Sequence, residues 1–235
     1  MVMSPTVERM DYGRTWIGLW TPHPYRLQAC AKEPFTVAWI EALPEGCVLH
    51  DIGANVGSYS LIAGKLGHPV VAIEPMAANY ADLVRNSILN GLNERIIPIP
   101  MALGEVTGLQ WLHLSDPKAG AANHFLGQPS NGNRPVFMHR TGVLLTRLDA
   151  ITAAFQLPPP THVKIDTDGN EIAVLNGFGD LSAGVQQVMI ETKDPVEQQI
   201  GEVLRSWGLE QKARFAERGG NPMIGLSYGY WVRPA

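Results

Sequence analysis

Short apolar runs alternate with helical apolar stripes along residues 35–208, and this pattern predicts strands interleaved with helices. The expected strands are Val48–Ile52, Val70–Ile73, Arg95–Pro100, His162–Asp166 and Val185–Glu191. Helices are expected over Phe35–Leu43, Tyr59–Leu66, Tyr80–Ile88, Thr146–Phe155, Glu171–Asn176 and Val196–Trp207. A capping-box spacing from Thr146 to Asp149 and the pair Asp194-Pro195 mark the starts of two of these helices.

The tail predicts two more strands, Leu209–Phe215 and Ile224–Val232, joined as a hairpin by a Gly219–Pro222 turn. Strand–helix–strand repeats of this length are typical of parallel strands with right-handed crossovers. The expected fold class is therefore α/β, with a doubly wound, mostly parallel seven-stranded sheet of Rossmann-like type and a C-terminal antiparallel hairpin. Residues 35–235 should form this single domain.

Two segments break the alternation. Leu109–Leu114 and Val136–Leu144 look like strands, but residues 115–135 between them are rich in Gly, Asn, Pro and Ala and lack any period. A loop of that length in a compact domain is usually disordered or functional, so we expect a lid-like loop there. Residues 1–34 read as an irregular arm rich in aromatic side chains. It is either loosely packed or folded over a site or a partner subunit, which leaves an oligomer open.

Composition narrows the class of partner. The formal net charge is −4 and no run of Lys or Arg is present, so a nucleic-acid partner is not expected. No apolar run is long enough to span a membrane, and no signal peptide is recognisable. Cys30 and Cys47 have no metal-ligand spacing. We expect a cytoplasmic protein that acts on a small molecule or a glycoconjugate.

The strongest local motif runs from Asp51 to Gly57 and follows the first buried strand. Gly53 and Gly57 allow a sharp turn and a close approach to a ligand, and Glu74 lies where a Rossmann-type unit places an acid on a ribose. A dinucleotide fingerprint would need a second glycine where Asn55 stands. Asp51 would repel a pyrophosphate, whereas it suits the amino end of S-adenosylmethionine, so this cofactor is favoured over NAD.

An adenine ring would lie beyond the third strand. Met101 and Ala102 follow that strand and offer an apolar, polarizable platform for a purine. The alternative is that both residues only fill the core.

Three stretches resemble the FkbM family of methyltransferases, most of which are regarded as O-methyltransferases. They are Asp51–Gly57, Ile73–Pro75 with the downstream Asn86 and Asn90, and Leu148-Asp149 with Lys164–Glu171, Val174-Leu175 and Gly177. The family usually has Val and Glu where Thr167 and Asp168 stand, a departure that keeps the acid. The resemblance covers residues 47–192 and implies a Rossmann-like methyltransferase fold. It leaves the arm, the tail and the choice of substrate open.

The switch point of the sheet should lie between the strands that end at Asp51 and Asp166, so Asp166 should face the transferable methyl group. Strand alternation puts Lys164 on the same face, where a buried ammonium needs an acid. The candidate acids are Glu171, Glu191 and Asp168. The cluster is either a structural ion pair or a device that orients substrate. The general base is His124 or His139, beside the long loop. Alternatively, Asp166, Glu191 and Asp194 gather a Mg²⁺ that lowers the pKa of a bound hydroxyl.

The function expected is methylation of a hydroxyl on a sugar, glycoconjugate or natural-product intermediate. N- or C-methylation, a catalytically silent protein that binds adenosylmethionine, and a nicotinamide oxidoreductase are the alternatives.

Overall fold

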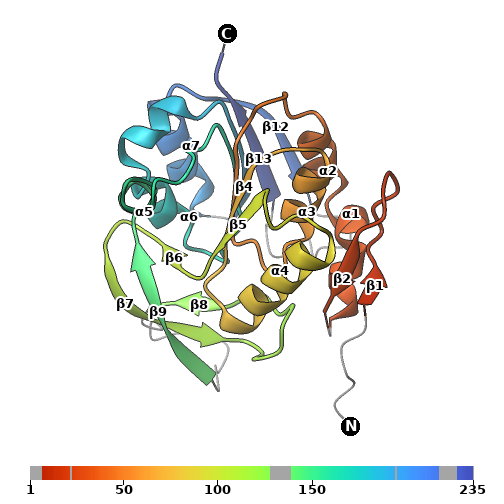
Figure 1. Ribbon diagram of the computed structural model, residues 1–235. Helices are drawn as coiled ribbons and strands as arrows, with labels where there is room; N and C mark the ends of the chain where they lie inside the picture. Colours follow the sequence, from red (N-terminus) through yellow and green to blue (C-terminus); the bar gives the residue numbers. More distant parts are fainter. Residues whose placement is uncertain (1–6, 22, 128–138, 194, 217–226, 235) are drawn as a thin grey trace.

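A seven-stranded sheet with helices on both faces forms the centre of the computed structural model (Figure 1). The structure describes residues 7–21, 23–127, 139–193, 195–216 and 227–234. Along the sheet the strands are β12 (Glu210–Ala216), β13 (Ser227–Val232), β11 (Gln187–Thr192), β10 (His162–Ile165), β3 (Leu49–Ile52), β4 (Val70–Ile73) and β5 (Ile96–Ile99). β13 runs antiparallel to both of its neighbours, and the strands from β11 to β5 are parallel.

Sheet order places the switch point where the sequence predicts it. From β3 the chain proceeds through β4 to β5 on one side, and it later returns to β10 and β11 on the other side. β3 and β10 are therefore neighbours, with Asp51 opposite Lys164 in the register. Ligands of doubly wound sheets bind in the crevice outside the carboxyl ends of such a strand pair.

Each face of the sheet has its own apolar core. On one face pack α2 (Pro34–Glu41), α3 (Ser58–Lys65) and α4 (Ala77–Leu89), together with the N-terminal segment. On the other face pack α5 (Leu148–Phe155), α6 (Glu171–Asn176) and α7 (Glu197–Ser206). Leu49 belongs to the first core and Ile52 to the second, as alternation along β3 requires.

The predicted α/β class is confirmed, and the parallel strands lie within two residues of their expected bounds. Both helix caps are corrected. Thr146 ends a strand, Arg147 is the N-cap of α5, and Asp149 bonds to the Arg147 guanidinium, so no capping box forms. Helix α7 has Val196 as its N-cap. Asp194 and the expected turn at Gly219–Pro222 lie outside the described residues.

A second sheet covers the edge of the domain below β5, and the sequence pattern did not predict it as a sheet (Figure 1). Its strands, in order, are β6 (Ala102–Leu103), β9 (His139–Thr146), β7 (Gly108–Leu114) and β8 (Phe125–Leu126). Of the expected loop 115–135, the structure describes residues 115–127, which include β8. Residues 115–127 run past the carboxyl ends of the central strands of the main sheet.

The arm is not irregular, contrary to the sequence-based expectation. It contains β1 (Val7–Arg9) paired with β2 (Gly18–Trp20), then η1 (Pro24–Gln28) and α1 (Ala29–Lys32). Met10, Tyr12, Ile17 and Leu19 are buried in the same core as α3. Aromatic and aliphatic residues thus fasten the arm to the domain.

Two asparagines, Asn86 in α4 and Asn90 at its C-cap, bind the arm. Each pairs with both the backbone N–H and the backbone carbonyl of one arm residue, as a neighbouring strand would. Asn90 accepts from Gly18 N at 3.0 Å and donates to Gly18 O at 2.7 Å. Asn86 accepts from Trp20 N at 2.6 Å and donates to Trp20 O at 3.3 Å. This Asn86–Asn90 pair, part of the family resemblance, therefore has a structural use: it holds the arm against the domain.

Among the described residues, no helix has the length and apolarity needed to cross a membrane.

Candidate active site

A cavity of about 560 Å³ opens at the carboxyl ends of the central strands. Its walls come from the ends of β3, β4, β5, β10 and β11, from residues 115–126 and from the arm. The lining includes His23, Tyr25, Arg26, Lys32, Gly53, Asn55, Glu74, Asn79, Met101, Ala102, Leu103, Asn123, His124, Asp166, Asp168, Glu191 and Lys193. Cavities of a few hundred cubic ångströms at a switch point are typical small-molecule sites.

The glycine motif shapes the cavity floor. Gly53 has a φ of +84°, and a Cβ there would overlap the carbonyl oxygen of Asp166. Glycine is therefore needed both for the backbone angle and for the approach of the β3 loop to the β10 loop. Gly57, the N-cap of α3 at φ +93°, faces Leu83 and does not line the cavity. Its role is packing.

Glu74 lies at the end of β4 with its carboxylate inside the cavity wall. It accepts from Asn55 N at 2.8 Å and from Met76 N at 2.9 Å. Burial raises the pKa of Glu74 to about 7, although these bonds oppose the shift. A carboxylate has about four acceptor positions, so both oxygens can still bind a diol.

Asp51 differs from its expected position. It is fully buried below the motif, accepts from Ser60 Oγ at 2.6 Å and does not line the cavity. Burial raises its pKa, and the charge of Lys164 opposes that shift. Strand alternation explains the position, because Asp51 points into the core that also receives Lys164. Asp51 therefore lies beneath the cavity floor, in the core with Lys164, and does not face a ligand in the cavity.

One end of the cavity is apolar. Met101, Ala102 and Leu103 line the wall after β5. Ala102 and Leu103 are buried, and Met101 is partly exposed to the cavity side. The three offer a surface against which a purine would stack or pack.

Lys164 and Asp166 are brought together. Lys164 Nζ lies 3.3 Å from Asp166 Oδ2 and 4.9 Å from the centre of the Tyr59 ring, with only 1% of its side chain exposed. Tyr228 OH donates to the same Asp166 oxygen at 3.3 Å. Burial opposes the charge on Lys164, but Asp166 and Asp51 raise its pKa overall.

Asp166 is the acid that spans floor and cavity. Its side chain is 22% exposed and lines the cavity. Burial alone would raise the pKa of Asp166, yet the charges of Lys164, Lys32 and Arg26 hold it below its usual range. At neutral pH it is an ionised hydrogen-bond acceptor facing the cavity.

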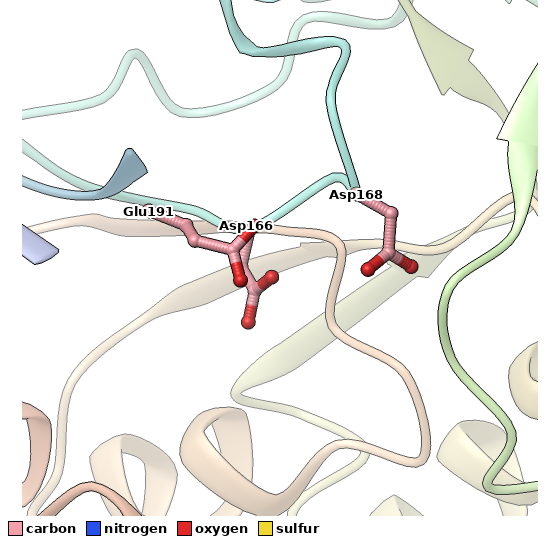
Figure 2. Close-up of side chains that lie close together, drawn as sticks. All are labelled: Asp166, Asp168 and Glu191. Carbon is pink, nitrogen blue, oxygen red and sulfur yellow. The ribbon is translucent and has the colours of Figure 1, made fainter. Parts of the chain in front are cut away.

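Three carboxyl groups meet beside this position (Figure 2). Oxygens of Asp166, Asp168 and Glu191 lie within 4.8 Å of one another. Burial, followed by the charge of Asp166, raises the pKa of Glu191, whose Oε2 is 3.1 Å from Lys193 Nζ. Oxygen ligands of this kind fit a hard divalent cation. Of the expected set Asp166, Glu191 and Asp194, the structure gathers the first two and adds Asp168.

The two candidate histidines are separated. His124 lines the cavity, and its Nε2 has no hydrogen-bond partner among the described residues. Burial, with the charge of Arg26, lowers the pKa of His124 to about 4. His139 is exposed at the start of β9, opposite Leu114, and does not line the cavity. The expectation that His139 could be the general base is therefore wrong, because the residue lies outside the cavity.

Residues 120–124 cross the cavity and are held by several parts of the chain. Asn79 of α4 accepts from Gly120 N at 2.7 Å and donates to Ala121 O at 3.1 Å. Arg26 Nε donates to Gly120 O at 2.8 Å, and Asn55 Nδ2 donates to Ala121 O at 2.7 Å. Asp168 Oδ2 accepts from Asn123 N at 2.6 Å and from His124 N at 3.2 Å. The crossing segment thus joins the arm, the glycine motif and the β10 loop.

Sequence reasoning missed Tyr228 and Arg26 as site residues. It gave Asp168 only as a candidate partner of Lys164, whereas Lys164 pairs with Asp166 and Asp168 joins the carboxyl cluster. Asp168 stood next to the proposed metal set, and its unusual φ of +58° is a conformational feature that only the structure shows. Tyr228 and Arg26 lie in segments outside the resemblance, so no motif marked them.

Comparisons with known proteins identify a family and a fold. A family model described as "Methyltransferase FkbM domain" matches residues 51–214. Hexuronic acid methyltransferase AglP of Haloferax volcanii is 27% identical over 154 residues, which cover 65% of this chain and 58% of the relative. The match thus spans little more than half of that relative.

Solved structures share the fold at low identity. TYW2 of P. horikoshii, in complex with MeSAdo, has a TM-score of 0.56 and 11% identity, covering 97% of this chain and 71% of that one. Ribosomal protein L11 methylase of Lactobacillus delbrueckii subsp. bulgaricus has a TM-score of 0.53 and 11% identity, with coverages of 87% and 80%. The tRNA m1G37 methyltransferase of M. jannaschii has a TM-score of 0.54 and 14% identity, with coverages of 99% and 58%.

Gly53 and Gly46 offer a matched test of the loop contact. Both have positive φ, but a Cβ on Gly46 would meet nothing within 4 Å. Gly46→Ala should cost about 1–2 kcal/mol of unfolding free energy from the backbone angle alone. Gly53→Ala should cost at least about 2 kcal/mol more, because the β3 and β10 loops must separate. Urea unfolding of both variants measures this difference, and equal costs would contradict the contact.

Proposed function

The chain belongs to the FkbM methyltransferase family, and from this premise we propose that it transfers the methyl group of S-adenosylmethionine to a hydroxyl oxygen of a sugar or glycoconjugate. The observation that carries the proposal is the cavity at the β3–β10 switch point. Glu74 stands on one side of it and Asp166 on the other.

The nucleoside half of the cofactor fits the side of the cavity near β4 and β5. The Glu74 carboxylate would accept hydrogen bonds from the ribose hydroxyls. Met101, Ala102 and Leu103 would contact the adenine. Asn55 holds Glu74 through its backbone N–H, which donates to that carboxylate, and holds residues 120–124 through its side chain, which donates to Ala121 O.

The acceptor half of the cavity lies between β10, β11 and the arm. When bound, the cofactor supplies an activated methyl group that an in-line displacement transfers to the acceptor oxygen. The Asp166 carboxylate would accept a hydrogen bond from the acceptor hydroxyl and align its oxygen. Lys164 and Tyr228 hold that carboxylate in place through one of its oxygens.

Two routes are open for the acceptor proton. His124 is neutral at physiological pH. Its Nδ1 accepts from Ser115 N at 3.3 Å, so Nε2 carries the ring proton, and the ring must change tautomer before Nε2 accepts a proton inside the cavity. The second route is a divalent cation such as Mg²⁺ held by Asp166, Asp168 and Glu191, which would lower the pKa of the hydroxyl. The first route requires a change of the His124 tautomer, and the second predicts sensitivity to chelators.

A sugar acceptor is supported by the relative from Haloferax volcanii, whose name states that it methylates hexuronic acid. A cavity lined by acids, histidines and cations can form hydrogen bonds with several hydroxyls at once. N- or C-methylation would use the same cofactor side, so product analysis separates these reactions. The expectations of a cytoplasmic location and of no nucleic-acid partner stay predictions.

Calorimetry tests the cofactor. S-adenosylmethionine and S-adenosylhomocysteine should both bind, and Glu74→Ala should weaken binding by roughly 1.5–3 kcal/mol through lost charge-assisted bonds. Glu94→Ala, at an exposed position, is the control and should bind as the wild type does. Binding of NADH in place of both adenosyl nucleotides would contradict the proposed function.

Asp166→Asn tests the acceptor side. The substitution keeps the shape, and kcat measured at saturating cofactor should fall by roughly 100-fold because alignment by the carboxylate is lost. Asp180→Asn, at an exposed position of the 3-10 helix η2 (Gly179–Gly184), is the matched control. A cation at the site would make the wild type sensitive to chelation. Full turnover by Asp166→Asn would assign the Lys164–Asp166 pair to structure alone.

A further inference from the structure

The arm residues 24–33 form one wall of a second, smaller cavity. This side cavity of about 30 Å³ shares Arg26, Lys32, Gly53, Asn55 and Asp166 with the main one, so the two are adjacent. Its remaining polar lining comes from Glu33, Ser58, Tyr59 and Lys164. None of the arm residues falls within the family match, which begins at Asp51.

Ser58 marks this cavity as a place for a polar ligand. The residue is 5% exposed, lines the side cavity, and its Oγ has no hydrogen-bond partner among the described residues. A buried hydroxyl without a partner is costly in a folded protein, which suggests that a ligand satisfies it.

Ser58 is also the first residue of α3, an eight-residue helix. The first turn of a helix presents backbone N–H groups that no helical carbonyl accepts. These groups and the helix dipole favour an anion at this end. The Ser58 hydroxyl and the N-terminus of α3 are thus both suited to binding an anionic hydrogen-bond acceptor.

Two cations of the arm face the same space. The Nε of Arg26 is fixed on Gly120 O at 2.8 Å. Its two terminal amino groups bind no other group in the described part of the chain, so they can bind a carboxylate. Lys32 Nζ lies 3.2 Å from Glu33 Oε1, and Lys32 lines both cavities, so its positive charge acts on an anion bound there. Both charges act on Asp166, which places them near the shared wall of the two cavities.

The lining therefore carries both signs of charge. Arg26, Lys32, Ser58 and the α3 N-terminus suit a carboxylate, and Asp166 on the shared wall suits an ammonium. This is the charge pattern of an α-amino acid. The floor of the main cavity, Gly53 to Asn55, lies between this pattern and the nucleoside side.

We propose that the α-carboxylate of the bound S-adenosyl cofactor enters the side cavity and is held there by Arg26, Lys32, Ser58 and the N-terminus of α3. The inference rests on the proposed function, because it assigns the amino-acid end of that cofactor. It makes the N-terminal arm part of the cofactor site. It also gives the bond between Arg26 and Gly120 a use, since the crossing segment and the carboxylate are fixed by one guanidinium.

The test compares two ligands that differ only in this carboxylate: S-adenosylmethionine and its decarboxylated form. The wild type should bind the decarboxylated ligand about 10- to 100-fold more weakly by calorimetry. Arg26→Ala and Lys32→Gln should each weaken binding of S-adenosylmethionine by about tenfold or more, and should change binding of the decarboxylated ligand by less than about twofold. Arg14→Ala is the matched control, because Arg14 lies on the arm, 66% exposed, outside both cavities.

Each alternative result is decisive. Equal affinity of the wild type for both ligands would overturn the inference and leave the proposed function standing. Equal losses for both ligands in Arg26→Ala and in Lys32→Gln would mean that the arm shapes the whole cavity without binding the carboxylate, which also overturns it. Failure of the wild type to bind either ligand would remove the proposed function itself.

Discussion

The charge of Lys164 is the constraint on which the site depends. It stands in a central parallel strand with 1% of its side chain exposed, where an unpaired ammonium would be very costly. Asp51 of β3, Asp166 after β10 and Glu33 of the arm stabilise this charge, and the Tyr59 ring lies against it. These partners come from four separate parts of the chain. Neutralising one buried lysine therefore brings together the glycine motif, the β10 loop and the arm.

That arrangement also sets the chemistry of the cavity. Because Lys164 and Tyr228 engage one oxygen of Asp166, its carboxylate is fixed and ionised at the border of the cavity. Gly53 allows the loop that carries Asp166 to pass directly over the β3 turn. Glu74 faces the same space from β4, so cofactor and acceptor sides meet at the switch point.

Local sequence patterns were sufficient for the central sheet and for part of the site. Parallel strands buried on both faces are continuous apolar runs, and their order follows from the crossover rules. The carboxyl ends of such strands share one edge, which is why Glu74, Met101 and Asp166 could be placed in the cavity from sequence. The orientation of Asp51 could not be predicted, because an acid at that position is equally consistent with binding a cofactor and with pairing a buried lysine. Strands β7 and β9 were predicted, but their pairing into a second sheet was not. The structure of the arm was missed because long-range contacts form it, such as the bonds of Asn90 to Gly18 and of Asn86 to Trp20. His139 lies in a strand whose register no local pattern specifies.

The central claim is that arm, glycine motif and crossing segment form one cofactor site, and hydrogen exchange tests it most directly. Addition of S-adenosylhomocysteine should slow amide exchange in residues 24–32, 53–58 and 120–124 together, because the ligand contacts or is enclosed by all three. The outer strands β12 and β13 should exchange as before. Slowing confined to residues 53–58, with the arm and the crossing segment unchanged, would contradict the account.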